Sequence, residues 1–231
     1  MKIIKPSYEI LDQIDGQAIL KKIELIGRVS HRSENRITKT SAAPFVKKLI
    51  QLGDESVLEH VSITVRFICD RGVSHELVRH RLMAVCQEST RYCNYSKGKF
   101  GNEITVIQPP FWNQHSALYG GWEIACRKAE KSYFELLANG ATPEKARSVL
   151  PNSLKTEVIC TANLREIRHI LQLRCSKRAH PQCRELMIPL LHELQSKIPI
   201  VFDDIAEKIR KQNDGIECLN KKKIMTKEEK K

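Results

Sequence analysis

Residues 61–69 read VSITVRFIC, and apolar side chains occupy every second position of this stretch. Successive side chains of an extended strand point to opposite faces, so a period of two gathers the apolar side chains on one face. Those side chains are Val61, Ile63, Val65, Phe67 and Cys69. The stretch therefore predicts a β-strand with one buried face, and residues 154–162 predict a second strand by the same alternation.

Helical periodicity in the rest of the chain predicts the fold class. Apolar residues recur there at intervals of three and four, as on one face of an α-helix. The predicted helices cover about 17–28, 41–52, 71–83, 116–138, 142–150, 163–173, 181–198 and 202–209, and a short strand covers 104–107. The helix over 71–83 would bring Glu76, Arg79 and His80 together, because residues three or four apart share a helix face. We predict an α+β fold with helices packed on a small antiparallel or mixed sheet.

The domain organisation is expected to be simple. No repeat and no long linker interrupts the chain, so residues 1–220 are predicted to form a single domain. The end of the chain, residues 221–231, reads KKKIMTKEEKK and is predicted to be a basic, disordered tail.

The composition indicates a protein of the cytoplasm. The chain has no run of about 18 apolar residues that could span a membrane, and its start, MKIIKPSYEILD, lacks the apolar core of a signal peptide. Eight cysteines are scattered singly without CxxC or zinc-like spacing. We therefore expect reduced thiols, no disulfide framework and no association with membranes.

The net charge of +12 points to anionic partners. Residues 221–231 carry six lysines against two glutamates, so most of the positive charge lies on the body of the chain. Nucleotides, phosphorylated metabolites and nucleic acids are all compatible with this charge.

Residues 79–92, RHRLMAVCQESTRY, concentrate the polar chemistry of the chain. They hold three arginines, a histidine, a glutamine, a glutamate, two hydroxyls and a phenol. Burying such groups without partners costs several kcal/mol each, so we expect them to face anionic ligands. The chain has no GxGxxG and no GxxxxGK[ST] motif, so a nucleotide would have to be held by side chains. Arginine suits that task, because its planar fork binds phosphate through two hydrogen bonds.

Metal and thiol chemistry are less favoured. His60, His75 and His80 have no carboxylate or cysteine at a useful spacing, so no metal site is predicted. Cys86 and Cys93 lie near cations that would lower a thiol pKa, yet no histidine base stands beside them in the sequence. We expect both thiols to be inert.

The same stretch resembles the signature of the flavin-dependent thymidylate synthases, RHRxxSxNExSxRY. RHR, seven residues, Ser, one residue and Arg-Tyr match it in order. Further matches are Arg28–Ser30, Glu55–His60, Ala146–Pro151 and Asn163–Glu166 with Leu173-Arg174. The likeness extends from about Arg28 to Leu186.

The resemblance implies the fold of that family and its reaction. The family converts dUMP to dTMP, with FAD as cofactor, 5,10-methylenetetrahydrofolate as methylene donor and NADPH as reductant. It also implies a homotetramer whose active sites are shared between subunits, and no protein cysteine acting as nucleophile. No nucleic-acid partner is expected.

The resemblance also assigns site residues. The residues expected to bind FAD are Ser30, Ser56, Glu59, Arg79, His80, Arg81, Leu82, Asn163, Arg165 and His169. Those expected to bind dUMP are Glu76, Arg79, Gln87, Ser89, Thr90, Arg91, Arg147 and Arg174. Arg91 and Arg147 would neutralise the phosphate. Arg174 is expected to be catalytic, polarising a pyrimidine carbonyl so that C5 becomes nucleophilic.

Four positions depart from the family pattern. Ala84, Cys86 and Gln87 stand where the signature has Ser, Asn and Glu, and Asp54 stands where a His is frequent. Two alternatives therefore stay open. The chain could bind nucleotides or nucleic acid without turnover, or it could be a flavoprotein that oxidises NADPH without methylating.

Overall fold

The computed structural model describes residues 1–212, which divide into two compact units. Unit 1 comprises Met1–Asp12, Ile63–Ala162 and Pro181–Leu186, and unit 2 comprises Gln13–Ser62, Asn163–His180 and the chain from Met187 onward. Each unit is therefore assembled from separate stretches of sequence. The predicted tail, 221–231, and the predicted domain end at residue 220 lie outside the described residues.

Unit 1 contains the two strands that the alternating sequence predicts. β3 (Ser62–Asp70) and β6 (Lys155–Asn163) are the central strands of a four-stranded sheet with the order β2-β3-β6-β4. β2 (Ser7–Ile10) runs antiparallel to β3 at one edge, and β4 (Met83–Gln87) runs antiparallel to β6 at the other. Burial alternates along both central strands, which confirms the two predicted strands. Together with the helices of the chain, this sheet confirms the predicted α+β class.

The predicted helix over 71–83 is wrong in its second half. α3 (Arg71–Leu77) begins at an Asp70 cap, whose carboxylate accepts a hydrogen bond from Val73 N at 2.6 Å, and it ends after seven residues. Residues 83–87 instead form β4, paired with 158–162 of β6. Arg79 and His80 therefore lie beyond the helix, and Glu76 does not share a helix face with them. Backbone pairing with a strand some 75 residues away in sequence overrides local helical periodicity here.

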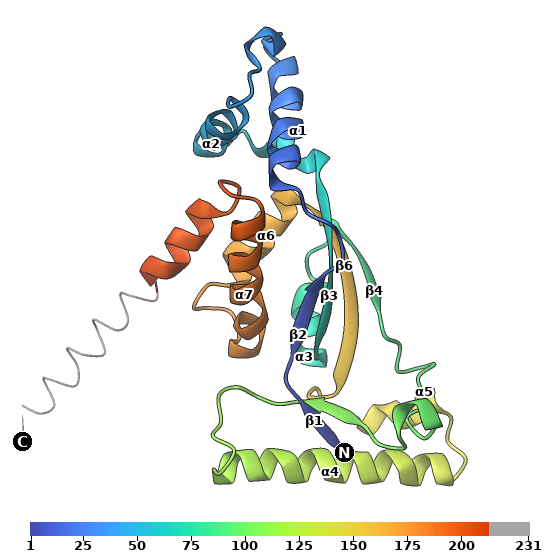
Figure 1. Ribbon diagram of the computed structural model, residues 1–231. Helices are drawn as coiled ribbons and strands as arrows, with labels where there is room; N and C mark the ends of the chain where they lie inside the picture. The colour runs from blue at the N-terminus through green and yellow to red at the C-terminus, as the bar shows by residue number, and fades with distance from the viewer. Residues whose placement is uncertain (213–231) are drawn as a thin grey trace, which may run out of the picture. The chain divides into compact units, whose positions relative to one another are not determined.

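A second layer of unit 1 packs around the long helix α4 (Ala117–Ala138). β1 (Lys2–Ile4) and β5 (Thr105–Ile107) form a parallel pair, and Figure 1 shows them above α4, with α5 (Pro143–Ala146) near its end. The buried side chains of this cluster are Tyr95, Ile104, Val106, Cys126, Tyr133, Ala146 and Leu154. Short turns of 3-10 helix occur at η3 (Gly98–Phe100) and η4 (Arg147–Val149).

Unit 2 is helical, and most of its helices begin or end as the sequence predicts. It contains α1 (Gly16–Val29), α2 (Ala42–Leu52), α6 (Leu164–Arg174) and most of α7 (Pro181–Lys197), and residues 203–212 are also helical. Two short 3-10 segments, η1 (Glu34–Arg36) and η2 (Glu55–His60), connect them. Gly53 ends α2 with φ of 78°, a left-handed conformation that glycine adopts without steric cost. Pro189 lies inside α7 without ending it.

The cysteines and the apolar helices carry no sign of disulfides or of a membrane span. The seven cysteines of residues 1–212 are all free thiols. Cys69 and Cys160 are buried in β3 and β6, where burial raises the pKa of Cys160 to about 11 and raises that of Cys69 further. Among the described helices, none is both long enough and apolar enough to cross a bilayer.

α1 and α2 approach each other closely at Gly27. A Cβ atom at this position would lie 2.8 Å from Phe45 Cε1 and 3.1 Å from Leu49 Cδ1. Real Cβ atoms do not come so close to carbon atoms, so the helix pair depends on the missing side chain.

Gly27→Ala is expected to destabilise the protein by about 1–3 kcal/mol, because the added methyl group overpacks the α1–α2 contact. The matched control is Gly120→Ala on α4, where an added Cβ meets nothing within 4 Å. That change should stabilise by about 0.5–1 kcal/mol, since alanine favours a helix over glycine. Urea unfolding midpoints measure both variants, and equal effects of the same sign would refute the close-approach argument.

Candidate functional site

A cleft of about 950 Å³ opens in unit 2 between α1, α2 and η2. Three of the residues predicted to bind the cofactor, Ser30, Ser56 and Glu59, line it. Asp54, the residue that departs from the family pattern, lines the same cleft. The structure thus brings together residues that are up to 29 positions apart in the sequence.

A buried arginine, Arg28, lies in the wall of this cleft. Arg28 Nε and Nη2 donate to Glu24 Oε1 at 2.9 and 2.7 Å, and its guanidinium lies 4.4 Å from the centre of the Phe45 ring. Ser41 Oγ donates to the other oxygen of Glu24 at 2.9 Å. Because both charges of this pair are matched, Arg28 shapes the wall instead of offering a free charge.

Two other cations on the cleft remain available for a ligand. Arg36 and Lys48 are exposed and line the cleft, and neither forms an ion pair within residues 1–212. Apolar side chains of Phe45, Leu49 and Leu52 line the cleft beside them. The sequence predicts Phe45, Leu49 and Leu52 only as the apolar stripe of a helix and gives no sign of Arg36 and Lys48 as site residues. Only the helix packing shows that the five share one surface.

α6 extends this site at Glu59. Arg165 Nη1 lies 2.5 Å from Glu59 Oε1, so the predicted cofactor residue Arg165 is joined to the cleft through an ion pair. His169 is exposed one turn further along α6, on the same face as Arg165. Asn163 caps this helix, since its Oδ1 accepts a hydrogen bond from Glu166 N at 2.9 Å. Asn163 therefore positions α6 through its oxygen and has its amide N–H groups left for other partners.

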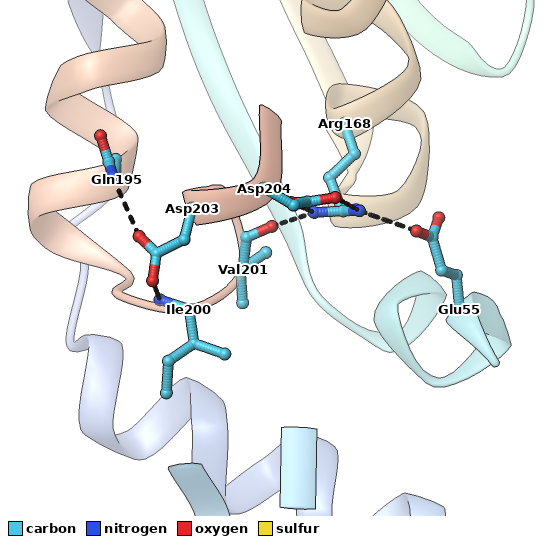
Figure 2. A network of polar contacts seen from close by, with 7 residues as sticks. All are labelled: Glu55, Arg168, Gln195, Ile200, Val201, Asp203 and Asp204. Atoms are coloured by element: carbon cyan, nitrogen blue, oxygen red, sulfur yellow. Dashed lines mark hydrogen bonds and ion pairs between the residues drawn. The ribbon is translucent and has the colours of Figure 1, made fainter. Parts of the chain in front are cut away.

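Arg168 of α6 forms a buried network, which Figure 2 shows. Its side chain is 2% exposed, and Nη2 lies 2.8 Å from both Glu55 Oε1 and Asp204 Oδ2. Nη1 donates to Asp204 Oδ1 at 2.8 Å and to the carbonyl oxygen of Val201. This one side chain therefore ties α6 to η2, which carries Ser56 and Glu59, and to the segment 201–204.

Contact between Arg168 and Asp204 shifts the pKa values of these two groups in opposite directions. Burial disfavours the charge on Arg168, but hydrogen bonds and attraction from Asp204 and Glu55 outweigh it and raise the pKa of the guanidinium. Partial burial also disfavours the charged form of Asp204, yet the contact with Arg168 lowers the pKa of this carboxyl. Both groups are thus held ionised.

In unit 1, four residues predicted to bind dUMP form a corner after β4, comprising Ser89, Thr90, Arg91 and Arg147. Arg147 Nη1 donates to the buried Thr90 Oγ1 at 3.1 Å. Ser89 Oγ accepts a hydrogen bond from Arg91 N at 3.3 Å. Arg91 Nε is 3.6 Å from Glu144 Oε2, and both side chains of that pair are about half exposed. The β4 corner therefore presents two exposed arginines beside two hydroxyls.

Gln87, another predicted substrate residue, lies at the end of β4 against two hydroxyls. Its Nε2 is 3.0 Å from Ser74 Oγ and 3.1 Å from Thr156 Oγ1. The next residue, Glu88, is paired with Lys155 at 2.7 Å. Ser74 and Thr156 gave no signal in the sequence as site residues, because their contact with Gln87 exists only once three separate elements have assembled.

The remaining predicted residues are more scattered. Arg79, Arg81 and Leu82 are exposed on the segment between α3 and β4, whereas His80 is buried there. Glu76 is half-buried on α3. Arg174 is half-buried as the last residue of α6, where the negative end of the helix dipole favours a cation. Ala84 and Cys86 are both exposed on β4.

No metal centre is formed by the part of the chain that the structure describes. Within residues 1–212, no group of three or more His, Cys, Asp or Glu side chains comes close enough to hold a metal ion.

Known proteins are similar to this chain in sequence. A family model described as thymidylate synthase complementing protein matches residues 11–200. The flavin-dependent thymidylate synthase of Pyrococcus furiosus is 31% identical over 194 residues, covering 84% of this chain and 77% of the relative. That of Geobacter sulfurreducens is 32% identical over 170 residues, covering 73% and 72%. The chain belongs to the flavin-dependent thymidylate synthase family. The family membership that the signature predicts is thus confirmed.

A solved structure shows the same fold. It is a UMP/dUMP methylase, PolB from Streptomyces cacaoi, bound with 5-Br dUMP. Its TM-score to this chain is 0.72, with 21% sequence identity, and the match covers 88% of this chain and 96% of that one. The fold is therefore kept although three signature positions differ.

Asp204→Asn should destabilise the protein at neutral pH by about 1 kcal/mol, a value discounted because the carboxylate is half exposed. Since contact with Arg168 lowers the pKa of Asp204, the carboxylate stabilises the fold above the ordinary Asp pKa of about 3.9, and this effect is lost as the pH falls further. Urea midpoints of parent and variant should therefore differ above about pH 4 and converge as the pH falls below it, through the lowered pKa of Asp204.

The control for this measurement is the same substitution in an Arg168→Met background. The partner cation is then gone, so the pH-dependent difference should become smaller, and only the part due to backbone hydrogen bonds at Asp204 and Ile205 should remain. A difference of unchanged size in this background would show that Asp204 does not act through Arg168.

Proposed function

We propose that this protein catalyses the reductive methylation of dUMP to dTMP, with 5,10-methylenetetrahydrofolate as methylene donor, NADPH as reductant and FAD as cofactor. Membership of the flavin-dependent thymidylate synthase family supports the reaction. The observation on the structure that carries it is the β4 corner, where Arg91 and Arg147 lie beside the hydroxyls of Ser89 and Thr90. This is a set of donors suited to a nucleotide phosphate.

The charges of the β4 corner are available to a phosphate. The Arg91–Glu144 pair is solvent-exposed, and exposed ion pairs contribute about 0–1 kcal/mol, so a doubly charged phosphate can replace the carboxylate. Arg147 donates one hydrogen to Thr90 and keeps four others for a ligand. Both arginines can therefore bind phosphate without breaking a costly contact.

Arg174 is proposed to act on the base. A guanidinium at the end of α6 can donate to a pyrimidine carbonyl and stabilise the negative charge that develops there when C5 attacks. A guanidinium stabilises such a developing negative charge without a proton transfer.

The α1–α2 cleft has the chemistry expected of a site for FAD. Its volume of about 950 Å³ lies within the range of cofactor pockets. Ser30 and Ser56 offer hydroxyls, Arg36 and Lys48 offer charges for a diphosphate, and apolar side chains of α2 line the same cleft. Bound FAD would supply hydride transfer, chemistry that no side chain provides.

No thiol is proposed to act as nucleophile. Burial raises the pKa of both Cys69 and Cys160, so these thiols stay protonated at neutral pH. This agrees with a family mechanism that needs no protein cysteine.

We also propose that the protein is a homotetramer with shared active sites. β4 is an edge strand, and large apolar side chains are exposed on and around it. They are Val78, Leu82, Val85 and Tyr92, of which Leu82 and Tyr92 are 76% and 79% exposed. An apolar surface at an unpaired strand edge favours association, and a second copy would cover it without exposing new apolar area.

The decisive experiment is a dTMP-formation assay with FAD, NADPH, methylenetetrahydrofolate and dUMP, in which each component is omitted in turn. Product formation should require all four. NADPH oxidation without dTMP would reduce the function to that of a flavin-dependent oxidase, and salt-sensitive binding of DNA or RNA without a preference for dUMP would favour a binding protein.

Arg174→Ala and Arg91→Ala form a matched pair that separates catalysis from binding. Arg174→Ala should abolish dTMP formation and leave FAD bound, because the lost contact forms mainly in the transition state. Arg91→Ala should raise the KM for dUMP with a smaller change in kcat, because a phosphate contact stabilises ground and transition states alike. Steady-state kinetics and flavin absorbance measure both, and unchanged dTMP formation by the Arg174 variant would remove its catalytic role.

Val85→Glu should dissociate the tetramer, because a charge on β4 would be buried against a second copy. The matched control is Ile124→Glu on α4, an exposed apolar residue away from β4 that should leave the tetramer intact. Light scattering gives the mass of both variants. A tetramer in both would place the subunit contact elsewhere.

A further inference from the structure

Gln87 departs from the family signature, which has Glu at this position, and its surroundings are matched to an amide. The two hydroxyls that contact its Nε2, Ser74 Oγ and Thr156 Oγ1, belong to fully buried residues on α3 and β6. Gln87 itself is half-buried at the end of β4, three residues before Thr90 of the β4 corner. The Gln87 side chain thus contacts two buried hydroxyls and is itself partly exposed near the β4 corner.

The direction of these hydrogen bonds follows from a third contact. Ser74 Oγ lies 2.9 Å from the carbonyl oxygen of Arg71, and a carbonyl oxygen can only accept. The single hydroxyl hydrogen of Ser74 is used there, so Ser74 must accept in its contact with Gln87. The amide orientation is therefore set by chemistry, with nitrogen toward Ser74 and Thr156.

This orientation gives Gln87 a defined polarity toward a ligand. Both amide hydrogens of Nε2 are used by Ser74 and Thr156, so Gln87 has no donor left to offer. Its Oε1 accepts no hydrogen bond from residues 1–212. Gln87 is thus an acceptor without charge, close in sequence to arginines that are proposed to bind a phosphate.

A carboxylate at this position would meet Ser74 differently. Its oxygen would face Ser74 Oγ with no hydrogen between them, because the Ser74 hydrogen is already donated to Arg71. It would also add a negative charge near the proposed phosphate site. Ser74 therefore favours the amide over the acid.

We propose that Ser74, together with Thr156, is a positioning residue that fixes the Gln87 amide so that its Oε1 accepts a hydrogen bond from the nucleotide substrate. The ligand group is a single O–H or N–H donor, which in dUMP is the sugar 3′-hydroxyl or the imide N–H of uracil. The inference rests on the proposed function, because it takes the substrate to be dUMP.

The test measures dUMP binding by calorimetry to FAD-loaded protein carrying Ser74→Ala, Gln87→Glu or both. Ser74→Ala should weaken dUMP binding about three- to tenfold, the effect of losing one oriented hydrogen bond. In the Gln87→Glu background the same substitution should leave binding unchanged or strengthen it, because it removes the opposing oxygen. A merely structural role of Ser74 would weaken binding in both backgrounds.

Ser153→Ala is the matched control. It removes another hydroxyl of unit 1, the acceptor of a 2.8 Å hydrogen bond from Trp122 Nε1, and does not contact Gln87. It should leave dUMP affinity unchanged.

A second ligand identifies the donor. With 2′,3′-dideoxyuridine monophosphate, loss of the sensitivity to Ser74→Ala would assign the donor to the sugar hydroxyl, and retained sensitivity would assign it to the imide. If Ser74→Ala does not fold, Gln87→Ala at the partly exposed strand end tests the acceptor directly, and unchanged dUMP affinity of that variant would overturn the inference.

Two failures can be told apart. Parent protein that does not bind dUMP would refute the proposed function. The inference would be overturned, with the function left standing, if Ser74→Ala bound dUMP as tightly as the parent protein does. The same holds if Ser74→Ala weakened binding equally in the parent and Gln87→Glu backgrounds.

Discussion

The antiparallel pairing of β4 with β6 is the constraint on which the β4 corner of unit 1 depends. It ends α3 after Leu77 and draws residues 83–87 into the sheet. It also places Gln87 opposite Val158, within reach of Thr156. The chain then turns sharply, and the β4 corner follows directly from the strand end. Backbone hydrogen bonds thus decide where the signature residues of the family lie.

In unit 2, two buried arginines with matched carboxylates supplement the apolar core. Arg28 is neutralised by Glu24, and Arg168 by Glu55 and Asp204. A buried arginine without such partners would cost several kcal/mol, so these pairs fix the relative positions of the helices that carry them. The exposed cations Arg36 and Lys48 line the cleft without an ion pair in the described part of the chain. The paired charges of this unit are thus buried, and the two proposed to meet a ligand are exposed.

The three departures from the family signature differ in their burial and in their hydrogen bonds. Ala84 and Cys86 are exposed on β4, so their replacement disturbs no buried contact of unit 1. Gln87 is different, because its amide is bonded to two buried hydroxyls. The change from an acid to an amide keeps an acceptor at this position and removes a negative charge. The chain thus belongs to the family at about 31% identity although this charge is absent.

The sequence by itself determined the two central strands, most helix limits and the family. Alternation over 61–69 depends only on which face is buried, and the caps at Asn163 and Gly53 are local contacts within a few residues. The signature from Arg79 to Tyr92 also lies within fourteen consecutive residues, so the sequence alone indicates the family.

Only the tertiary structure decided that residues 83–87 form a strand, that Ser74 orients Gln87 and that Arg168 joins three segments. Each depends on groups more than ten residues apart, and often more than thirty. Local periodicity carries no information about which distant group will satisfy a buried donor or acceptor. The partners exist only once the backbone has folded, because hydrogen bonds and ion pairs require contact in space and not proximity in sequence.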